Sequence, residues 1–396
     1  MFRSSFFFTI IVFYFVAKAC CDDPEVYMNA TSLIVYNGFP EENHYVETKD
    51  GFILNIQRIP HGRFATKATK GVVVVQHGLT GASDDFLINL IPGSLGFVLA
   101  DAGYDVWLSN SRGNVYSMTH KKYNPSQDEF WDWSWQEMAE YDLPAVIHYV
   151  LNTTNATTVY YIGHSQGTMI ANAQFSVDKD LASKIKLFIS MAPIAKVTHV
   201  RGLLGFINPY VTQKEAELVL GKKAFDQNST LTKWYADTFC TFLPAQYICN
   251  GLSSIVMGWD RTNLNWASLF FYTRIPVFTA HSNEGASAKD IIHFLQGIKA
   301  DKFQKYDYGP DGNMKRYNQT TPPEYHPQNM AVPVAMFYGD NDFLADRTDV
   351  QYLLDNLPNI VHQKELPNWN HVDFIIGKDA HQLLYTDILN IMSKYQ

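Results

Sequence analysis

The pentapeptide at residues 163–167 has the residue types needed to activate a serine. It reads Gly-His-Ser-Gln-Gly, a G-x-S-x-G pattern centred on Ser165. Before it, residues 158–162 form a β-branched and aromatic run typical of a buried strand, and residues 168–175 after it contain no helix breaker. A strand, a tight turn bounded by glycines and a helix predict a nucleophile elbow, although the bare pattern is common. Ser165 would then lie where free backbone N–H groups of the helix point outward.

A serine hydroxyl is a weak nucleophile that needs a base, and the base needs a carboxylate to fix its tautomer. With an elbow of this kind, the acid and then the histidine follow the serine along the chain, on loops after late strands. His371 follows one such predicted strand and is the base candidate, and Asp342 follows another and is the acid candidate. Spacing alone does not separate Asp342 from Asp340 or Asp346.

Acyl transfer at Ser165 also needs two N–H donors for the negative oxygen of the intermediate. One is the backbone N–H of the residue after the nucleophile, which is Gln166. The other comes from a loop after an early strand. Residues 77–79, His-Gly-Leu, follow the buried run 71–76 and offer the N–H of Leu79. The chemistry predicted here calls for no metal and no cofactor.

The elements that must position these residues alternate in the first half of the chain. Strands are predicted at residues 43–59 (a pair around a turn at 50–51), 71–76, 103–108, 158–162 and 185–191. A helix is predicted to start with Asp142 as its capping residue and Pro144 in its first turn. Buried strands alternating with helices indicate an α/β fold, with a mostly parallel sheet covered by helices on both faces.

This alternation breaks after Pro193 and resumes near residue 328. The last third is predicted to hold strands at 332–338 and 360–366 and helices at 346–354 and 380–392. We therefore divide the chain into a core at residues 22–195, a mostly helical insertion at 196–327 and the rest of the core at 328–396. Such an insertion would cover the carboxyl edge of the sheet, where open α/β folds place their sites.

The N-terminus has the features of a targeting segment. Arg3 precedes an apolar run at residues 6–17, which is too short to span a bilayer, so residues 1–21 are predicted to be a signal peptide. No later stretch is long and apolar enough for a transmembrane helix. The net charge of −8 argues against nucleic acid as a partner, and a charged fraction of 18% beside 46% hydrophobic residues indicates a folded globular protein.

In an exported protein, a pair of cysteines predicts a disulfide and Asn-x-Ser/Thr sequons predict glycosylation. Cys240 and Cys249 are close in sequence and are predicted to form a disulfide that closes a short loop. Five Asn-x-Ser/Thr sequons without proline predict glycosylation at Asn29, Asn152, Asn155, Asn228 and Asn318.

The sequence resembles the acid lipase family, which includes gastric, lingual and lysosomal acid lipases. The matching segments are residues 77–79, 100–108, 110–114, 137–139, 141–145, 163–168, 302–304, 342, 344–346 and 370–374. The resemblance implies an α/β-hydrolase fold and selects Asp342 as the acid, beside Ser165 as nucleophile and His371 as base. It also implies that Leu79 and Gln166 form the oxyanion hole.

Within the insertion, the resemblance matches Cys240 and Cys249 to the disulfide pair of the family and residues 196–327 to its cap and lid. Two segments depart from the family pattern. Residues 283–287 read Asn-Glu-Gly-Ala-Ser in place of Pro-Ala-Gly-Thr-Ser, and residues 340–342 lack the usual pair of glycines. The first departure bears on cap shape and substrate range, and the second on the geometry of the acid loop.

The function expected from these residues is hydrolysis of carboxylic esters of neutral lipids, triacylglycerols or steryl esters, through an acyl-enzyme at Ser165. Such a protein would act at a lipid–water interface and be secreted or lysosomal. Two alternatives remain. A carboxylesterase of smaller soluble esters, or a peptidase on the same fold, would use the same residues. A non-catalytic lipid-binding protein on the same fold would be expected to have lost a member of the Ser-Asp-His set, and none is lost here.

Overall fold

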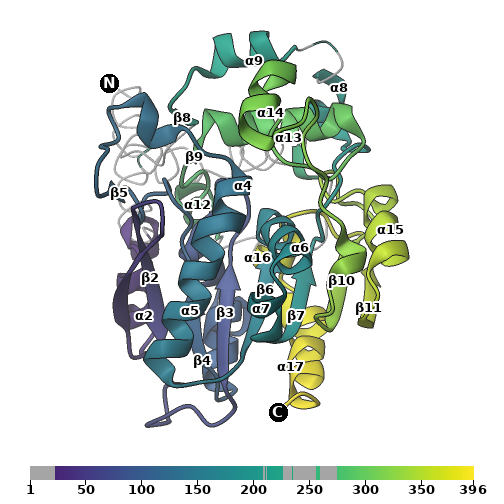
Figure 1. Cartoon of the computed structure of the whole chain (residues 1–396). Coiled ribbons are helices and arrows are strands. Elements are labelled where there is room, and N and C mark those ends of the chain that lie inside the picture. The colour runs from purple at the N-terminus through teal and green to yellow at the C-terminus, as the bar shows by residue number, and fades with distance from the viewer. Residues whose placement is uncertain (1–22, 208–209, 211, 226–233, 235–255, 259–273) are drawn as a thin grey trace, which may run out of the picture.

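One large sheet forms the centre of the computed structural model, which describes residues 23–207, 210, 212–225, 234, 256–258 and 274–396. Its nine strands run in the order β1-β2-β4-β3-β6-β7-β10-β11, with β5 paired to β2 (Figure 1). The strands are β1 (Glu42–Glu47), β2 (Phe52–Ile59), β3 (Val72–Gln76), β4 (Asp105–Leu108), β5 (Thr119–His120), β6 (Val159–His164), β7 (Ile185–Met191), β10 (Val334–Gly339) and β11 (Ile360–Leu366). Pairing is antiparallel around β2 and parallel from β4 to β11, so the prediction of a mostly parallel α/β sheet is confirmed.

The central strands are buried along their whole length. Every residue of β3, β6 and β10 is buried, whereas β1 and β11 at the two edges alternate between half-buried and exposed positions over most of their length. Strands covered on both faces by helices need apolar residues at consecutive positions, because neither face meets water. This is why continuous apolar runs predicted the central strands correctly.

After β3 the chain first adds β4 on one side of this strand and then adds β6 on the other side. Helix α3 (Leu95–Asp101) links β3 to β4 on one side, and α5 (Leu143–Thr154) links β4 to β6 on the other side of β3. Right-handed crossovers that run in opposite directions place their helices on opposite faces of the sheet. The crossover through α6 (Gln166–Val177), from β6 to β7, moves across the sheet in the same direction as the crossover through α5. Helix α6 therefore lies on the same face as α5 and contacts it. The carboxyl ends of β3 and β6 therefore adjoin at the reversal point, where open α/β sheets hold their ligands.

Helix α5 begins at Leu143 with Pro144 in its first turn, as predicted, but the prediction that the side chain of Asp142 caps it is wrong. The helical segment begins with α4 (Trp135–Glu137), passes through a π-helical turn and continues as α5. Its N-cap is Ser134, which forms a capping box with Glu137. Asp142 has helical backbone angles, and its carboxylate accepts bonds from Nε and Nη2 of the buried Arg112 at 2.9 and 2.7 Å. A buried guanidinium needs an anionic partner, and this requirement overrides the local capping signal.

The remaining helices of the core complete its surface. They are α2 (Ala30–Tyr36), α7 (Lys179–Ser183), α15 (Arg347–Asn356), α16 (Asp373–Ile376) and α17 (Thr386–Ser393), with π-helical turns at Met138–Asp142 and His381–Tyr385 and 3-10 turns at Pro24–Tyr27, Ser83–Phe86, Ile91–Gly93, Asp128–Trp131 and Pro327–Asn329. Helix α15 and the segment that ends in α17 confirm the two helices predicted near the C-terminus.

The predicted insertion holds helices and a small sheet. The helices are α8 (Gly202–Ile207), α9 (Gln213–Leu220), α12 (Ile275–Ala280), α13 (Ala288–Ala300) and α14 (Gly309–Tyr317). Helices α8, α9, α13 and α14 lie together above the sheet, at the top of Figure 1. The sequence did not predict the two-residue strands β8 (Ala224–Phe225) and β9 (Ala286–Ser287), which pair antiparallel. The domain boundaries at residues 196 and 327 stay a prediction.

Candidate active site

Ser165 lies between β6 and α6 in a backbone conformation that side chains rarely adopt. Its φ is 54° and its ψ is −119°, and its N–H donates to the carbonyl of Met191 at 3.0 Å. Both flanking glycines are required by close contacts. A Cβ on Gly163 would lie 2.8 Å from the carbonyl of Gly167, and a Cβ on Gly167 would lie 2.6 Å from the carbonyl oxygen of Gln76. The turn therefore presents Ser165 at the end of β6, as the elbow predicts.

His371 joins Ser165 to Asp342. Its Nε2 lies 2.6 Å from Ser165 Oγ, and its Nδ1 lies 2.9 and 2.8 Å from the two carboxylate oxygens of Asp342. All three side chains are buried. Because an ionised carboxylate only accepts hydrogen bonds, the ring hydrogen belongs on Nδ1, and Nε2 is free to accept the hydroxyl proton of Ser165. The structure thus brings together the three residues that the sequence predicted to act together.

The loop after β10 gives its three aspartates different partners. Asp342 faces His371 and also accepts from the N–H groups of Leu344 and Ala345 at 2.9 and 2.8 Å. Asp340 accepts from a backbone N–H of the neighbouring loop, and Asp346 caps α15. Geometry therefore places only Asp342 of these three against the histidine. The missing glycine pair at residues 340–342 does not prevent this contact.

A short segment of the insertion is hydrogen-bonded to both loops that carry the acid and the base. The carbonyl of Met257 accepts from the N–H of His371 at 3.1 Å and from the N–H of Phe343 at 3.4 Å. The carbonyl of Gly258 accepts from Asn370 Nδ2 at 3.1 Å. No sequence pattern predicts these contacts, because the accepting groups are backbone carbonyls of residues more than eighty positions away.

Residues 77–79 follow β3 and lie directly beside the elbow. A Cβ on Gly78 would lie 3.0 Å from Ser165 Cβ and 3.4 Å from its Oγ, so glycine lets this loop come close without displacing the nucleophile. His77 Nδ1 donates to the carbonyl of Gly78 at 2.7 Å, while His77 Nε2 accepts from the N–H of Ser111 at 3.0 Å. Burial lowers the pKa of His77 to about 4, which keeps this tautomer neutral.

His164, inside the pentapeptide, is a site residue that sequence reasoning did not assign. Its Nε2 donates to the carbonyl of His371 at 3.0 Å. Burial, with the nearby His371 as a second cause, lowers the pKa of His164 to about 3. A neutral His164 therefore holds the backbone of the base without adding a charge beside it.

Buried residues with metal-ligand side chains lie near the loop that follows residue 79. Asp84, His281 and Glu284 are close together, but both ring nitrogens of His281 are engaged within the protein. Its Nδ1 lies 2.9 Å from Asp84 Oδ2 and its Nε2 lies 2.9 Å from the carbonyl of Glu25. The N–H of Glu284 also donates to the carbonyl of Thr80 at 2.7 Å. These contacts tie the N-terminal segment and the insertion to this loop.

Four of the predicted glycosylation sites lie within the described residues. Asn29, Asn152, Asn155 and Asn318 are all exposed. Asn228 and the predicted Cys240–Cys249 disulfide lie outside the described residues. The aromatic residues at 130–135 are buried and pack on one another and on the core, so their role is structural.

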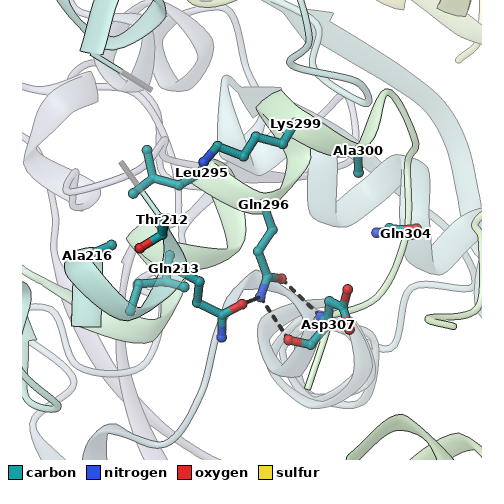
Figure 2. A pocket seen from close by; sticks show the side chains of 10 residues that line it. Thr212, Gln213, Ala216, Leu295, Gln296, Lys299, Ala300, Gln304 and Asp307 are labelled. Atoms are coloured by element: carbon teal, nitrogen blue, oxygen red, sulfur yellow. Dashed lines mark hydrogen bonds between the residues drawn. The ribbon is translucent and has the colours of Figure 1, made fainter. Parts of the chain in front are cut away.

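A cavity of about 260 Å³ lies in the insertion between α9 and α13, and Figure 2 shows the side chains that line it. Across it, Gln296 Nε2 donates to Gln213 Oε1 at 3.0 Å and to the carbonyl of Asp307 at 2.8 Å. Its lining residues are Thr212, Gln213, Ala216, Ile292, Leu295, Gln296, Lys299, Ala300, Gln304 and Asp307. The lining does not include Ser165, Asp342 or His371, so this cavity is distinct from the candidate active site.

The chain matches two family models. One describes the partial alpha/beta-hydrolase lipase region and covers residues 30–90, and the other describes the alpha/beta hydrolase fold and covers residues 71–378. Among solved structures, a monoglyceride lipase from Saccharomyces cerevisiae shares the fold, with a TM-score of 0.54 at 15% identity over 90% of this chain and 96% of that one.

Two relatives illustrate the similarity over nearly the whole length. The lysosomal acid lipase/cholesteryl ester hydrolase of Homo sapiens is 43% identical over 385 residues, which cover 96% of this chain and 94% of that protein. The gastric triacylglycerol lipase of Bos taurus is 40% identical over 375 residues, which cover 94% and 93%. With the fold, these similarities show that the chain belongs to the acid lipase family of α/β-hydrolases.

Proposed function

We propose that this chain hydrolyses the carboxylic ester bonds of neutral lipids, with Ser165 as nucleophile, His371 as general base and Asp342 as its carboxylate partner. The observation that carries the proposal is the 2.6 Å contact between Ser165 Oγ and His371 Nε2, with Asp342 on the opposite ring nitrogen. The human and bovine relatives are named for cholesteryl esters and triacylglycerols, which supports both as substrate classes for this chain.

The geometry supports a two-step reaction. Ser165 Oγ attacks the ester carbonyl carbon while His371 Nε2 takes the hydroxyl proton, and Asp342 stabilises the imidazolium that forms. The intermediate collapses when its bond to the alcohol breaks and His371 returns the proton to the leaving oxygen. Water, activated by the same base, then attacks the acyl-enzyme and releases the fatty acid. No step requires a metal or a cofactor.

The negative oxygen of each intermediate needs donors that are already in place. We assign this role to the backbone N–H groups of Gln166 and Leu79. Gln166 is the first residue of α6, so its N–H is among those that have no partner within the helix. The close approach of Gly78 to Ser165 brings the Leu79 peptide to the same side chain.

Exposed apolar side chains on the insertion support contact with a lipid–water interface. On α8, Leu203 and Phe206 are 45% and 72% exposed, and on α9, Leu218 and Val219 are 85% and 82% exposed. Exposed apolar side chains gathered on one part of a protein often mark an interaction surface. Such residues would lie against lipid when an emulsified substrate reaches the site.

We also propose that the chain enters the secretory pathway through residues 1–21 and acts in the lysosome or outside the cell. The lysosomal and gastric relatives support such a route. The exposure of Asn29, Asn152, Asn155 and Asn318 leaves each of these asparagines accessible to a glycan. Within the described residues, no helix is both long and apolar enough to cross a membrane.

The proposal is tested with emulsified triacylglycerol, emulsified cholesteryl ester and soluble p-nitrophenyl butyrate, together with labelling by an organophosphonate. Ser165→Ala should lose the label and lower kcat on all substrates by roughly 10⁴-fold or more. Ser176→Ala is the matched control, because Ser176 is a buried serine of α6 whose hydroxyl donates only to the carbonyl of Ala173. It should keep both the label and the activity.

Each result separates the alternatives. Activity on the butyrate ester alone would support a carboxylesterase of small esters. An unlabelled Ser165 in folded protein would support a non-catalytic lipid-binding protein and overturn the enzymatic mechanism.

A further inference from the structure

A fully buried carboxyl group of the insertion lies against the residue that follows the nucleophile. Asp290 is in the first turn of α13, where its own N–H donates to the capping residue Ser287 at 2.9 Å. Its Oδ2 accepts from Gln166 Nε2 at 2.6 Å, and its Oδ1 accepts from the N–H of Trp135 at 2.7 Å. One carboxyl group thus joins the insertion to the elbow helix α6 and to the start of α4.

The charged groups around Asp290 leave it without a cationic partner among the described residues. On α13, Lys289 Nζ is bonded to Asp132 and to Tyr308, and burial lowers the pKa of His293 to about 3, which keeps that ring neutral. On α4 the charged side chain is Glu137, a further carboxylate whose charge acts on Asp290. Gln166 on α6 and Ser287 before α13 carry no charge.

These surroundings oppose ionisation of the carboxyl group. Burial is the largest cause, and it raises the pKa of Asp290 to about 7. The bonds from Gln166 and Trp135 lower this pKa, and the charge of Glu137 raises it. Asp290 therefore changes its charge within a pH range in which an ordinary aspartate stays ionised.

The amide of Gln166 can hold Asp290 in both protonation states. When Asp290 is ionised, the Nε2 hydrogens donate to its carboxylate. When Asp290 is protonated, a rotated amide offers Oε1 as the acceptor of the carboxyl hydrogen. The contact survives in either state, but only the ionised state places a buried negative charge beside Gln166.

From this geometry we infer that Asp290 is a positioning residue, which acts through Gln166 on the oxyanion hole and makes turnover fall when it ionises. The inference rests on the proposed function, in which the N–H of Gln166 stabilises a negative oxygen. A second buried negative charge next to that donor opposes the charge that develops in the transition state. The neutral acid keeps the same hold on Gln166 without this opposition.

The experiment measures kcat and KM on soluble p-nitrophenyl butyrate from about pH 4 to 9, so that adsorption to lipid plays no part. In the unmodified protein kcat/KM should fall as the pH rises through about 7. Asp290→Asn keeps an amide partner for Gln166 but cannot ionise, so its descending limb should move up by more than about one pH unit.

Asp290→Ala removes the hold on Gln166 and should lower kcat at acidic pH by about tenfold, with a smaller change in KM. Asp290→Asn should recover most of that loss. The control is Asp349→Asn on α15, because burial also raises the pKa of Asp349, whose carboxylate is bonded to His199. Its pH profile should match that of the unmodified protein.

An unchanged descending limb in Asp290→Asn overturns the inference, and so does equal activity of the Ala and Asn variants. If the Ala variant does not fold, the profile of the Asn variant decides alone. Phosphonate labelling of Ser165 in the same preparations separates the two proposals. Labelled, active protein with no shift contradicts only the role of Asp290, whereas unlabelled Ser165 contradicts the proposed function itself.

Discussion

His77 Nδ1 lies 2.7 Å from the carbonyl oxygen of Gly78 and fixes the peptide that carries the Leu79 N–H. The peptide unit is planar and trans, so its N–H points away from its carbonyl. The bond from the N–H of Ser111 to His77 Nε2 holds the ring from the other side. The orientation of one proposed oxyanion donor therefore depends on a side chain that does not touch the substrate.

Replacing His77 by phenylalanine should lower kcat by roughly 10- to 100-fold, with KM changed much less, because the ring would no longer hold the Gly78 carbonyl. Steady-state kinetics on p-nitrophenyl butyrate measures this. His362→Gln, at a half-buried histidine in β11, is the control and should retain normal kinetics. A folded His77 variant with normal kcat would show that the loop holds its shape without the ring.

Asp342→Asn should lower kcat by about 10⁴-fold, because an amide can donate to His371 Nδ1 and favour the wrong tautomer. Asp340→Asn should change kcat by less than about threefold, since among the described residues the Asp340 carboxylate accepts from the N–H of Asn368 and an amide oxygen can do the same. Comparing the two variants at one pH tests the assignment of the acid. Similar losses in both would contradict it.

Replacing a glycine of the pentapeptide by alanine should lower both the stability and the activity of the protein, and Gly167 tests this. Gly167→Ala places a Cβ 2.6 Å from the carbonyl oxygen of Gln76 and 2.8 Å from that of His77, so β3 or α6 must move. We expect about 2–3 kcal/mol of lost stability in urea unfolding, together with loss of activity. The matched variant is Gly221→Ala, at a φ of 75° with no atom within 4 Å of the added Cβ. Its ψ of −152° makes alanine strained there, so it should lower stability by about 1–3 kcal/mol but leave activity intact.

The strands and the positions of Ser165, Asp342 and His371 could be predicted because local signals carried them. Consecutive apolar residues mark strands buried on both faces, and polar residues at the ends of such strands meet at one edge of the sheet. Choosing Asp342 over Asp340 and Asp346 needed the family resemblance, since all three lie on the same loop within seven positions.

Contacts that depend on tertiary structure left no local signal. Asp290 and Gln166 are 124 positions apart, and the bond between Met257 and His371 uses only backbone atoms. Asp142 was misread as a cap because the sequence Asp-Leu-Pro is a sound local start signal, while its partner Arg112 comes from another loop. Two-residue strands such as β8 and β9 are too short to show any period.

Buried histidines should make the fold less stable in acid. The pKa of His293 is lowered to about 3 by burial, so between about pH 6.5 and 3 the unfolded chain binds a proton that the folded chain does not. Stability from this residue is thus present above about pH 6.5 and is lost as the pH falls. The loss between about pH 6.5 and 4.5 should be roughly 2 kcal/mol. Asp290 has the opposite effect on stability, because its pKa is raised from 3.8 to about 7. Between these pH values the folded chain binds a proton at Asp290 that the unfolded chain does not, so this contribution to stability grows as the pH falls.

His293→Gln should therefore flatten the pH dependence of stability even though it lowers stability at neutral pH. The variant loses the stacking of the ring on Trp135 and weakens the bonds to Ser134 and Gln304, and it has no group that titrates. Urea unfolding at about pH 6.5 and 4.5 should show a smaller difference in the free energy of unfolding than in the unmodified protein, by roughly 2 kcal/mol. His148→Gln, at an exposed histidine of α5, should leave that difference unchanged. An equal acid loss in the His293 variant would mean that this ring is already protonated in the folded protein, against the burial that keeps it neutral.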